Sequence, residues 1–280
     1  MLKENVKKLY KDVKEIDDGG IITTQSIEMV QAVLDVPNIA NFVETVITDG
    51  AVALVDENDT IEAEILGEME VANGERDIQL ANDKVIGKKK ARITTNVKAT
   101  KQLLNDSIDF AENAVAVINK RVARALANVI VNGNEKFEGQ CLSDVESTLT
   151  EEELTVDSLR KLMIEMKEEH LSNACFILAE GEFKKLSKVK KANGEYEIKF
   201  NPHIGLYEIH GLPIFVMKEL NCKALLVNLH QAYKLVVSPN VDLRSFEQDA
   251  FLALSGVDGL INSIYVDGAI KNKAAIKKLA

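Results

Sequence analysis

The stretch from Asp56 to Lys90 most constrains the fold, because it is patterned as strand but has too little apolar surface for a core. The segment Asp56–Asp77 contains nine acidic side chains and one arginine. Apolar and acidic residues alternate in its first half, at Ile61, Glu62, Glu64, Ile65, Glu68, Met69, Glu70 and Val71. This alternation is typical of a strand with one apolar face. Because that face is weak, the strand must lie on another surface.

An Asn-Gly pair, Asn73–Gly74, lies near the centre of this stretch and predicts a hairpin. Both residues accept positive φ, which tight hairpin turns need. Two limbs of about 15 residues, at about 3.3 Å per residue, would each reach about 50 Å. An isolated two-stranded hairpin is not independently stable. We call residues 56–90 the charged hairpin and expect its support to come from outside it.

Composition places the chain among folded proteins of one large domain or two modest ones. It has 280 residues, of which 46% are hydrophobic and 28% charged, which argues against wholesale disorder. The net charge of −10 argues against a class of protein that binds nucleic acid by neutralising phosphates. No apolar run is long enough for a membrane span, and the N-terminal residues lack the apolar block of a secretory signal. The three cysteines, without a CxxC pair, predict reduced thiols in an intracellular protein.

The first 16 residues are patterned as an amphipathic helix. Its narrow apolar stripe consists of Leu2, Val6, Leu9, Val13 and Ile16, and the segment Asp17–Gly20 ends it. A lone helix of this length is marginal in water, so the stripe predicts a partner surface on its own domain or on a neighbouring chain. Residues 21–55 look irregular to extended.

The clearest helix is predicted from Asp106 to Asn132, with Gly133 after its end. Its apolar stripe is Ala111, Val115, Ile118, Val122, Leu126 and Val129, while Lys120, Arg121 and Arg124 lie off the stripe.

From Gly139 onward the pattern is mixed α/β. It predicts a helix capped by Thr155, a strand at 174–179, a helix from Glu180, an Asn193–Gly194 turn, and strands at 210–217 and 223–238. The tail from Phe246 predicts strands with turns at Gly256, Gly259 and Gly268.

We find no motif that carries chemistry. The histidines His170, His203, His210 and His230 have no metal-ligand spacing and read as surface or turn residues. Acidic clusters read as solvated faces, with Glu151–Glu153 favourable at the start of the following helix. The basic run Lys88, Lys89 and Lys90 is too short for a nucleic-acid patch, so its natural partner is another copy of the chain. We expect no catalytic residue, metal or cofactor.

The order of these pieces resembles the major capsid proteins of tailed bacteriophages with the Hong Kong 97-like fold. The resemblance spans residues 41–279. It is carried by the charged hairpin and by four stretches in the same order and spacing: Lys88–Ser107, Val117–Gln140, Phe183–Val216 and Phe246–Asn272. No single motif is specific alone.

The resemblance implies an α+β fold with a characteristic division. Its parts are an N-terminal helix and arm (1–40), a peripheral domain with a long spine helix (41–55 and 91–138), the extended hairpin loop (56–90), an axial domain (139–240) and a return to the peripheral domain (241–280). It implies that many copies form hexamers and pentamers in an icosahedral head around double-stranded DNA, without sequence-specific contacts. A scaffolding protein and a portal are implied partners, with no membrane. The implied location is the virion head, assembled in the bacterial host cytoplasm.

The resemblance also implies roles for the charged hairpin and the N-terminal stripe. The apolar and acidic residues from Ile61 to Val71, the lysines 88–90, and Leu2, Val6, Leu9 and Val13 would contact neighbouring subunits. Some relatives form a Lys–Asn isopeptide link between subunits, aided by a Glu. Here Asp249 and Gly256 fall where that Asn and Glu would be, so we expect a non-covalent shell without enzymatic activity. About 20 residues precede the arm, so either a separate scaffolding protein acts or the helix of residues 1–16 does a reduced version of that work.

Two alternatives remain open at this stage. One is the shell of an encapsulin-like compartment or a domesticated prophage particle, which would share the fold. The other is a soluble α/β enzyme with an unrecognised site, which would need a pocket with convergent polar groups.

Overall fold

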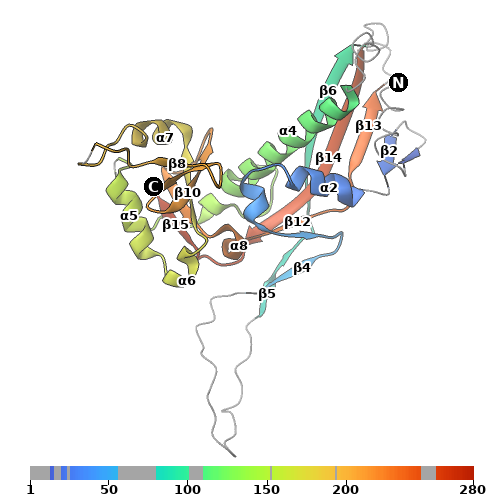
Figure 1. Cartoon of the computed structure of the whole chain (residues 1–280). Coiled ribbons are helices and arrows are strands. Elements are labelled where there is room, and N and C mark those ends of the chain that lie inside the picture. Colours follow the sequence, from blue (N-terminus) through green and yellow to red (C-terminus); the bar gives the residue numbers. More distant parts are fainter. Residues whose placement is uncertain are drawn as a thin grey trace, which may run out of the picture.

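The computed structural model describes residues 13–15, 20–23, 26–55, 80–100, 110–151, 153–192, 194–246 and 257–280. These residues form two lobes, each built around one β-sheet, and a separate two-stranded sheet projects between them (Figure 1). The arrangement is a mixed α and β fold.

The larger lobe holds a seven-stranded sheet, counted over the described residues. Its strands follow the order β1-β2-β13-β14-β12-β3, and β6 also pairs with β14. Their bounds are β1 (Val13–Glu15), β2 (Gly20–Thr23), β3 (Glu44–Ile47), β6 (Ala91–Thr100), β12 (Tyr233–Val237), β13 (Asp242–Phe246) and β14 (Val257–Ile270). All ten residues of β6 pair antiparallel with β14, so β14 is the strand that organises this lobe.

The long strand β14 corrects the sequence-based expectation of turns at Gly259 and Gly268, because both glycines lie inside it. At Gly268 the physical reason is close packing. A Cβ atom there would lie 2.5 Å from the Tyr233 hydroxyl oxygen and 2.7 Å from its ring. The glycine therefore makes room for a buried tyrosine, which a sequence pattern cannot distinguish from a turn.

The predicted long helix is confirmed as α4 (Phe110–Asn132), which runs along β6 and β14 in Figure 1. Its apolar stripe packs on the sheet, with Ile118, Val122 and Leu126 at most 1% exposed. Gly133 has φ of +73° and its N–H donates to the carbonyl oxygen of Val129 at 3.0 Å. The helix therefore ends on the left-handed glycine that the sequence predicts.

The N-terminal region differs from the sequence-based expectation in two places. Residues Val13–Glu15 form strand β1, not the end of a helix, and pair antiparallel with β2. The expected helix over residues 1–12 and its residues Leu2, Val6 and Leu9 lie outside the described part. Residues 21–55, expected to be irregular, contain α2 (Ser26–Leu34) and the short 3-10 helix η1 (Ile39–Phe42). The helix α2 contacts α4, and this tertiary packing stabilises it. It has too few periodic apolar residues to be predicted from the sequence.

The smaller lobe holds a sheet with six strands in the described part of the chain, in the order β15-β11-β7-β10-β9-β8. Its strands are β7 (Cys175–Ala179), β8 (Lys199–Asn201), β9 (Leu206–Ile209), β10 (Leu212–Met217), β11 (Ala224–Val227) and β15 (Ile276–Leu279). Helices α5 (Val156–Glu165), α6 (Glu168–Leu171) and α7 (Glu180–Leu186) belong to the same lobe (Figure 1). Leu159, Leu162 and Phe176 lie fully buried in its core.

Local signals in this lobe are largely confirmed. The Thr155 hydroxyl accepts a hydrogen bond from the Ser158 N–H at 3.1 Å and caps α5 as predicted. Gly194 has φ of +85° at the predicted turn, while Asn193 lies outside the described residues. The sequence predicts strand throughout 223–238, but one helical turn, α8 (Leu229–Ala232), separates β11 from β12. The Asn228 side chain accepts from the Gln231 N–H at 3.3 Å and starts this turn.

Two strands pair in a different lobe from the one that holds most of their expected domain. Strand β12, within 139–240, pairs in the seven-stranded sheet, and β15, within 241–280, pairs in the six-stranded sheet. Period-2 alternation identifies a strand but does not say which sheet it joins. The division into domains stays a prediction.

Candidate functional site

The described base of the charged hairpin is a two-stranded sheet of its own. Strands β4 (Val52–Val55) and β5 (Leu80–Ile86) pair antiparallel, with Val52 opposite Ile86. Residues 56–79, which hold the predicted Asn-Gly turn and the candidate contact residues from Ile61 to Val71, lie outside the described part. We call β4, β5 and the following segment Gly87–Lys90 the hairpin root.

A small apolar cluster attaches the hairpin root to the larger lobe. Leu54 and Ile86 pack against Val236 of β12 and Ala269 of β14. Leu54 is 2% exposed and Ile86 is 6% exposed. This cluster is much smaller than the cores of the two lobes, so the two-stranded sheet buries little apolar surface against the described part of the chain.

Gly87 and Asp267 determine where the chain leaves the hairpin root. The Gly87 N–H donates to one Asp267 carboxylate oxygen at 2.6 Å, and the Gly268 N–H donates to the other at 2.8 Å. Gly87 has φ of +90°, and a Cβ atom there would lie 2.9 Å from the carbonyl oxygen of Gly50. This contact was not predicted from the sequence, because 180 residues separate the partners. The isolated glycine between Ile86 and Lys88 was the one local sign of an unusual backbone conformation there.

The three lysines after Gly87 have different environments. Lys89 forms an exposed ion pair with Glu138 at 2.7 Å, and this carboxylate raises the pKa of Lys89. The Lys90 ammonium donates to the carbonyl oxygen of Thr48 at 2.7 Å, and its side chain is 12% exposed. Lys88 is exposed and has no ion pair with any described residue. A contact of these lysines with another copy stays a prediction, and the structure shows that Lys89 and Lys90 already have acceptors within the chain.

A cavity of about 380 Å³ lies beside the hairpin root. It is lined by the hairpin root, by residues 138–140 and by residues 267–269 of β14. Gly139 packs backbone to backbone on Gly268, where a Cβ atom would lie 2.4 Å from the Gly268 carbonyl oxygen. The cavity is formed by the junction of the root with the sheet, and its lining is mixed polar and apolar.

Another cavity, of about 630 Å³, lies in the smaller lobe between the start of α5, α7 and the turn before β8. Four carboxylates line it, from Glu153, Asp157, Glu182 and Glu197. Glu182 pairs with Lys185 at 2.7 Å, and Glu197 with Lys191 at 3.7 Å. Lysines thus neutralise two of the four carboxylates. The cavity is a charged surface groove, and its carboxylates do not resemble a catalytic acid–base pair, whose two members have clearly different pKa values.

The four histidines differ in burial, and one of them is buried. His170 is 6% exposed and its ring Nδ1 lies 2.7 Å from the Gln231 side-chain oxygen, which corrects the expectation of a surface or turn residue. His203, His210 and His230 are exposed, and His210 occupies a turn with φ of +52°. Within the described residues, no group of three or more His, Cys, Asp or Glu side chains could hold a metal ion.

None of the described helices combines the length and apolar character that crossing a membrane requires.

Comparisons with known proteins identify a family from the sequence and a shared fold from the structure. A family model described as the phage capsid family matches residues 21–280. A comparison with curated protein sequences finds no match. Among solved structures, the chain is similar to the capsid of an empty GTA particle computed with C5 symmetry, with a TM-score of 0.66 and 17% identity over 86% of this chain and 88% of that chain.

Two further structures show the same fold at low identity. One is from Microbacterium phage Oxtober96, with a TM-score of 0.59 and 10% identity, covering 86% of this chain and 90% of that chain. The other is the virus-like particle from Pyrococcus furiosus, with a TM-score of 0.54 and 14% identity, covering 92% of this chain and 99% of that chain.

Proposed function

The chain belongs to the phage capsid family, and we propose that many copies of it close without covalent links into an icosahedral head shell around double-stranded DNA. The observation that carries this proposal is the hairpin root. A two-stranded sheet with so small an apolar cluster beneath it needs further support. In the proposal a neighbouring subunit gives that support to residues 56–79.

The proposal assigns each part of the fold a place in the shell. The lobe with the six-stranded sheet is the axial domain, which lies at the centre of each hexamer or pentamer. The lobe with α4 and the seven-stranded sheet is the peripheral domain, and α4 is its spine helix. The candidate contact residues of the charged hairpin and Val13 of β1 lie against neighbouring subunits. Repetition of modest contacts over a closed shell makes the whole assembly stable.

In this proposal the subunits form no covalent links with one another, and the reason lies in the sequence. Asp249 and Gly256 stand where crosslinking relatives have Asn and Glu, and both positions lie outside the described residues. A scaffolding protein and a portal are the further protein partners, and the shell is assembled in the bacterial cytoplasm. The subunit acts as a structural protein and not as an enzyme.

The test compares two variants with the same change in charge. Glu62, Glu64 and Glu68 are changed to Gln in the charged hairpin, and the exposed residues Glu135, Glu146 and Glu165 are changed to Gln in the control. A third variant replaces residues 58–77 with an Asn-Gly turn, which keeps β4 and β5. We expect the control to form shells by negative-stain microscopy, while the hairpin variants fold normally by circular dichroism but form few or no closed shells.

Two results would contradict the proposal. If the shortened hairpin unfolds the isolated subunit, residues 58–77 belong to its own core. If the shortened variant closes shells as efficiently as the wild-type chain, the hairpin does not support assembly.

A second candidate function is a domesticated particle or compartment with the same shell. The similarity to the GTA particle and to the Pyrococcus furiosus virus-like particle favours keeping it. The contents of purified particles distinguish the candidates: long phage DNA supports a phage head, short mixed DNA fragments support a domesticated particle, and an enzyme without DNA supports a compartment.

A further inference from the structure

The described part of the exposed face of α4 has a charge opposite to that of the chain as a whole. The side chains described as exposed on this helix recur at helical spacing: Asn113, Ala116, Val117, Lys120, Arg121, Arg124 and Asn128. This set of described residues contains three cations and no carboxylate, while the chain carries a net charge of −10. We call Lys120, Arg121 and Arg124 the basic face of α4.

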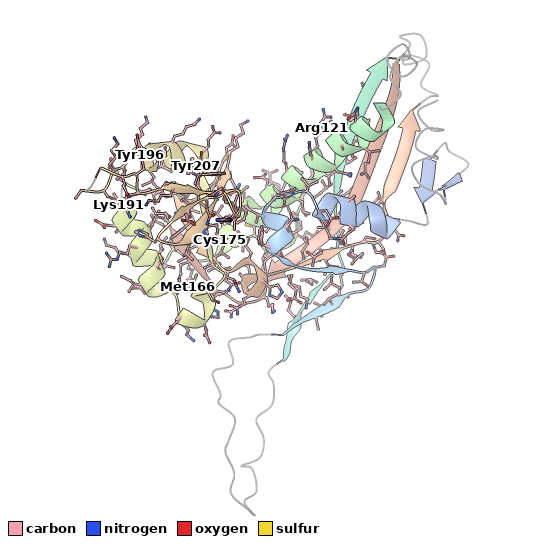
Figure 2. The ribbon with its side chains drawn as sticks, viewed as in Figure 1. Arg121, Met166, Cys175, Lys191, Tyr196 and Tyr207 are labelled. Atoms are coloured by element: carbon pink, nitrogen blue, oxygen red, sulfur yellow. The ribbon has the colours of Figure 1, made fainter. Side chains whose placement is uncertain are left out.

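The cations of this face are available to an outside partner. None of them forms an ion pair with a described residue. Arg121, labelled in Figure 2, donates one N–H to the carbonyl oxygen of Asn96 at 2.7 Å. This bond anchors the guanidinium on β6 and is the one hydrogen bond that its five N–H donors make to the described residues. Uncompensated cations held in place on a rigid helix are suited to an anion that approaches from solvent.

The spacing of these cations fits a nucleic-acid backbone. Lys120 and Arg124 are four residues apart, so they lie about 6 Å apart along the helix axis. Each strand of a duplex carries one phosphate per about 3.4 Å of its axis. The basic face therefore spans about two to three phosphates and could contact each of them without reading the base sequence.

From this charge pattern we propose that α4 lines the inner surface of the shell and that its basic face contacts the phosphates of the enclosed DNA. The proposal rests on the proposed function and adds which side of the subunit faces inward. The opposite side of the sheet then faces outward. On β6, Ile93 and Val97 pack towards α4, while Lys98 is exposed on the other face of the strand.

The first test measures the access of reagents to closed shells. Single variants Lys120→Cys and Lys98→Cys are labelled with a maleimide on a long polymer, which the shell excludes, and with a small maleimide, which enters. The native cysteines react slowly, because Cys141 and Cys175 are buried and burial raises the pKa of Cys222 to about 11. Wild-type chain without an added cysteine, treated with the same two reagents, serves as the background control.

We expect position 120 to react with the large reagent only in unassembled subunits and with the small reagent in both states, while position 98 reacts with both reagents in shells. Reaction of position 120 with the large reagent in shells would overturn the inference. So would its failure to react with either reagent in shells, since it would then be covered by another subunit. Absence of shells from the wild-type chain would count against the proposed function instead, and microscopy shows this first.

The second test measures phosphate contacts directly. Unassembled subunits are titrated with a duplex of about 20 base pairs by fluorescence anisotropy at several salt concentrations. Three phosphate contacts contribute about −2.7 to the slope of log affinity against log salt, a weakening of about 40-fold between about 50 and about 200 mM salt. The variant Lys120→Gln/Arg121→Gln/Arg124→Gln should lose this contribution.

The matched control is Lys98→Gln/Lys188→Gln/Lys273→Gln. These three lysines are exposed, and none forms an ion pair with a described residue, so the change in net charge is the same. We expect the control to keep the wild-type slope. An unchanged slope in the α4 variant, or an equal loss in the control, would overturn the inference.

Discussion

Replacing Gly87 with Ala tests whether one close backbone approach holds the hairpin root in place. Gly87 has φ of +90°, a conformation that L side chains rarely adopt, and its missing Cβ leaves room for the carbonyl oxygen of Gly50 at 2.9 Å and for Val236 at 3.3 Å. Its N–H also donates to the buried Asp267. A methyl group would have to displace backbone and would weaken that hydrogen bond.

The structure contains a control with the same backbone strain and no contact. Gly211 has φ of +82° and nothing within 4 Å of an added Cβ. Strain alone costs about 1 kcal/mol of unfolding free energy at either glycine. Overpacking at Gly87 adds about 2 kcal/mol, so we expect Gly87→Ala to lose about 3 kcal/mol and Gly211→Ala about 1 kcal/mol.

Urea unfolding of unassembled subunits, followed by circular dichroism, measures the difference. With a slope of about 3 kcal/mol per M, the two variants should differ by about 0.7 M in midpoint. If both variants unfold at the same urea concentration, the contact between Gly87 and Gly50 does not constrain the root and the reasoning fails. Microscopy on the same variants should show that Gly87→Ala also impairs shell closure more than Gly211→Ala.

Three further predictions concern single interactions. Thr155→Ala should lower the unfolding free energy by about 1 kcal/mol in urea, because α5 loses its cap, whereas Thr155→Ser should not. Lys90→Gln should cost about 1.5 kcal/mol in the same assay, because the Thr48 carbonyl oxygen loses a charged donor; no loss would contradict the bond. Burial raises the pKa of Glu44, but hydrogen bonds and charge from two lysines outweigh it and lower that pKa below 4.5. The stability that its ionised form contributes is therefore present in full above the ordinary pKa of a glutamate and is lost as the pH falls through the lower pKa of the folded state. The pH dependence of the urea midpoint in that acidic range should therefore be weaker in Glu44→Gln.

Features set by neighbours along the chain were predictable. The stripe through Ile118, Val122 and Leu126 identifies α4, and Gly133 identifies its end, because helix periodicity and capping are local. The same holds for Thr155 at the start of α5. Only one strand of the hairpin base was predicted, because β5 lies within residues 56–90 while its partner β4 ends at Val55, before the acidic stretch.

Features that depend on distant partners were not predictable. Gly268 reads as a turn residue in the sequence, but it lies inside β14 and gives space to Tyr233, 35 positions earlier in the chain. The apolar spacing around strand β1 also fits a helix, and pairing with β2 decides in favour of strand. The sequence pattern places His170 at the surface, although the chain folds around it and provides Gln231 as a partner.

The amino-acid order alone determined that this protein has one long amphipathic helix, several short buried strands and a charged stretch too polar to form a core. These properties follow from periodicity and side-chain chemistry over a few residues. Only the tertiary structure decided that the chain leaves the hairpin root at Gly87, in contact with Gly50 and Asp267, and that the sheet covers one face of α4 and leaves the face with the three cations exposed. Such contacts depend on the path of the whole chain, since the free energy of a close approach exists only once the distant segments have met.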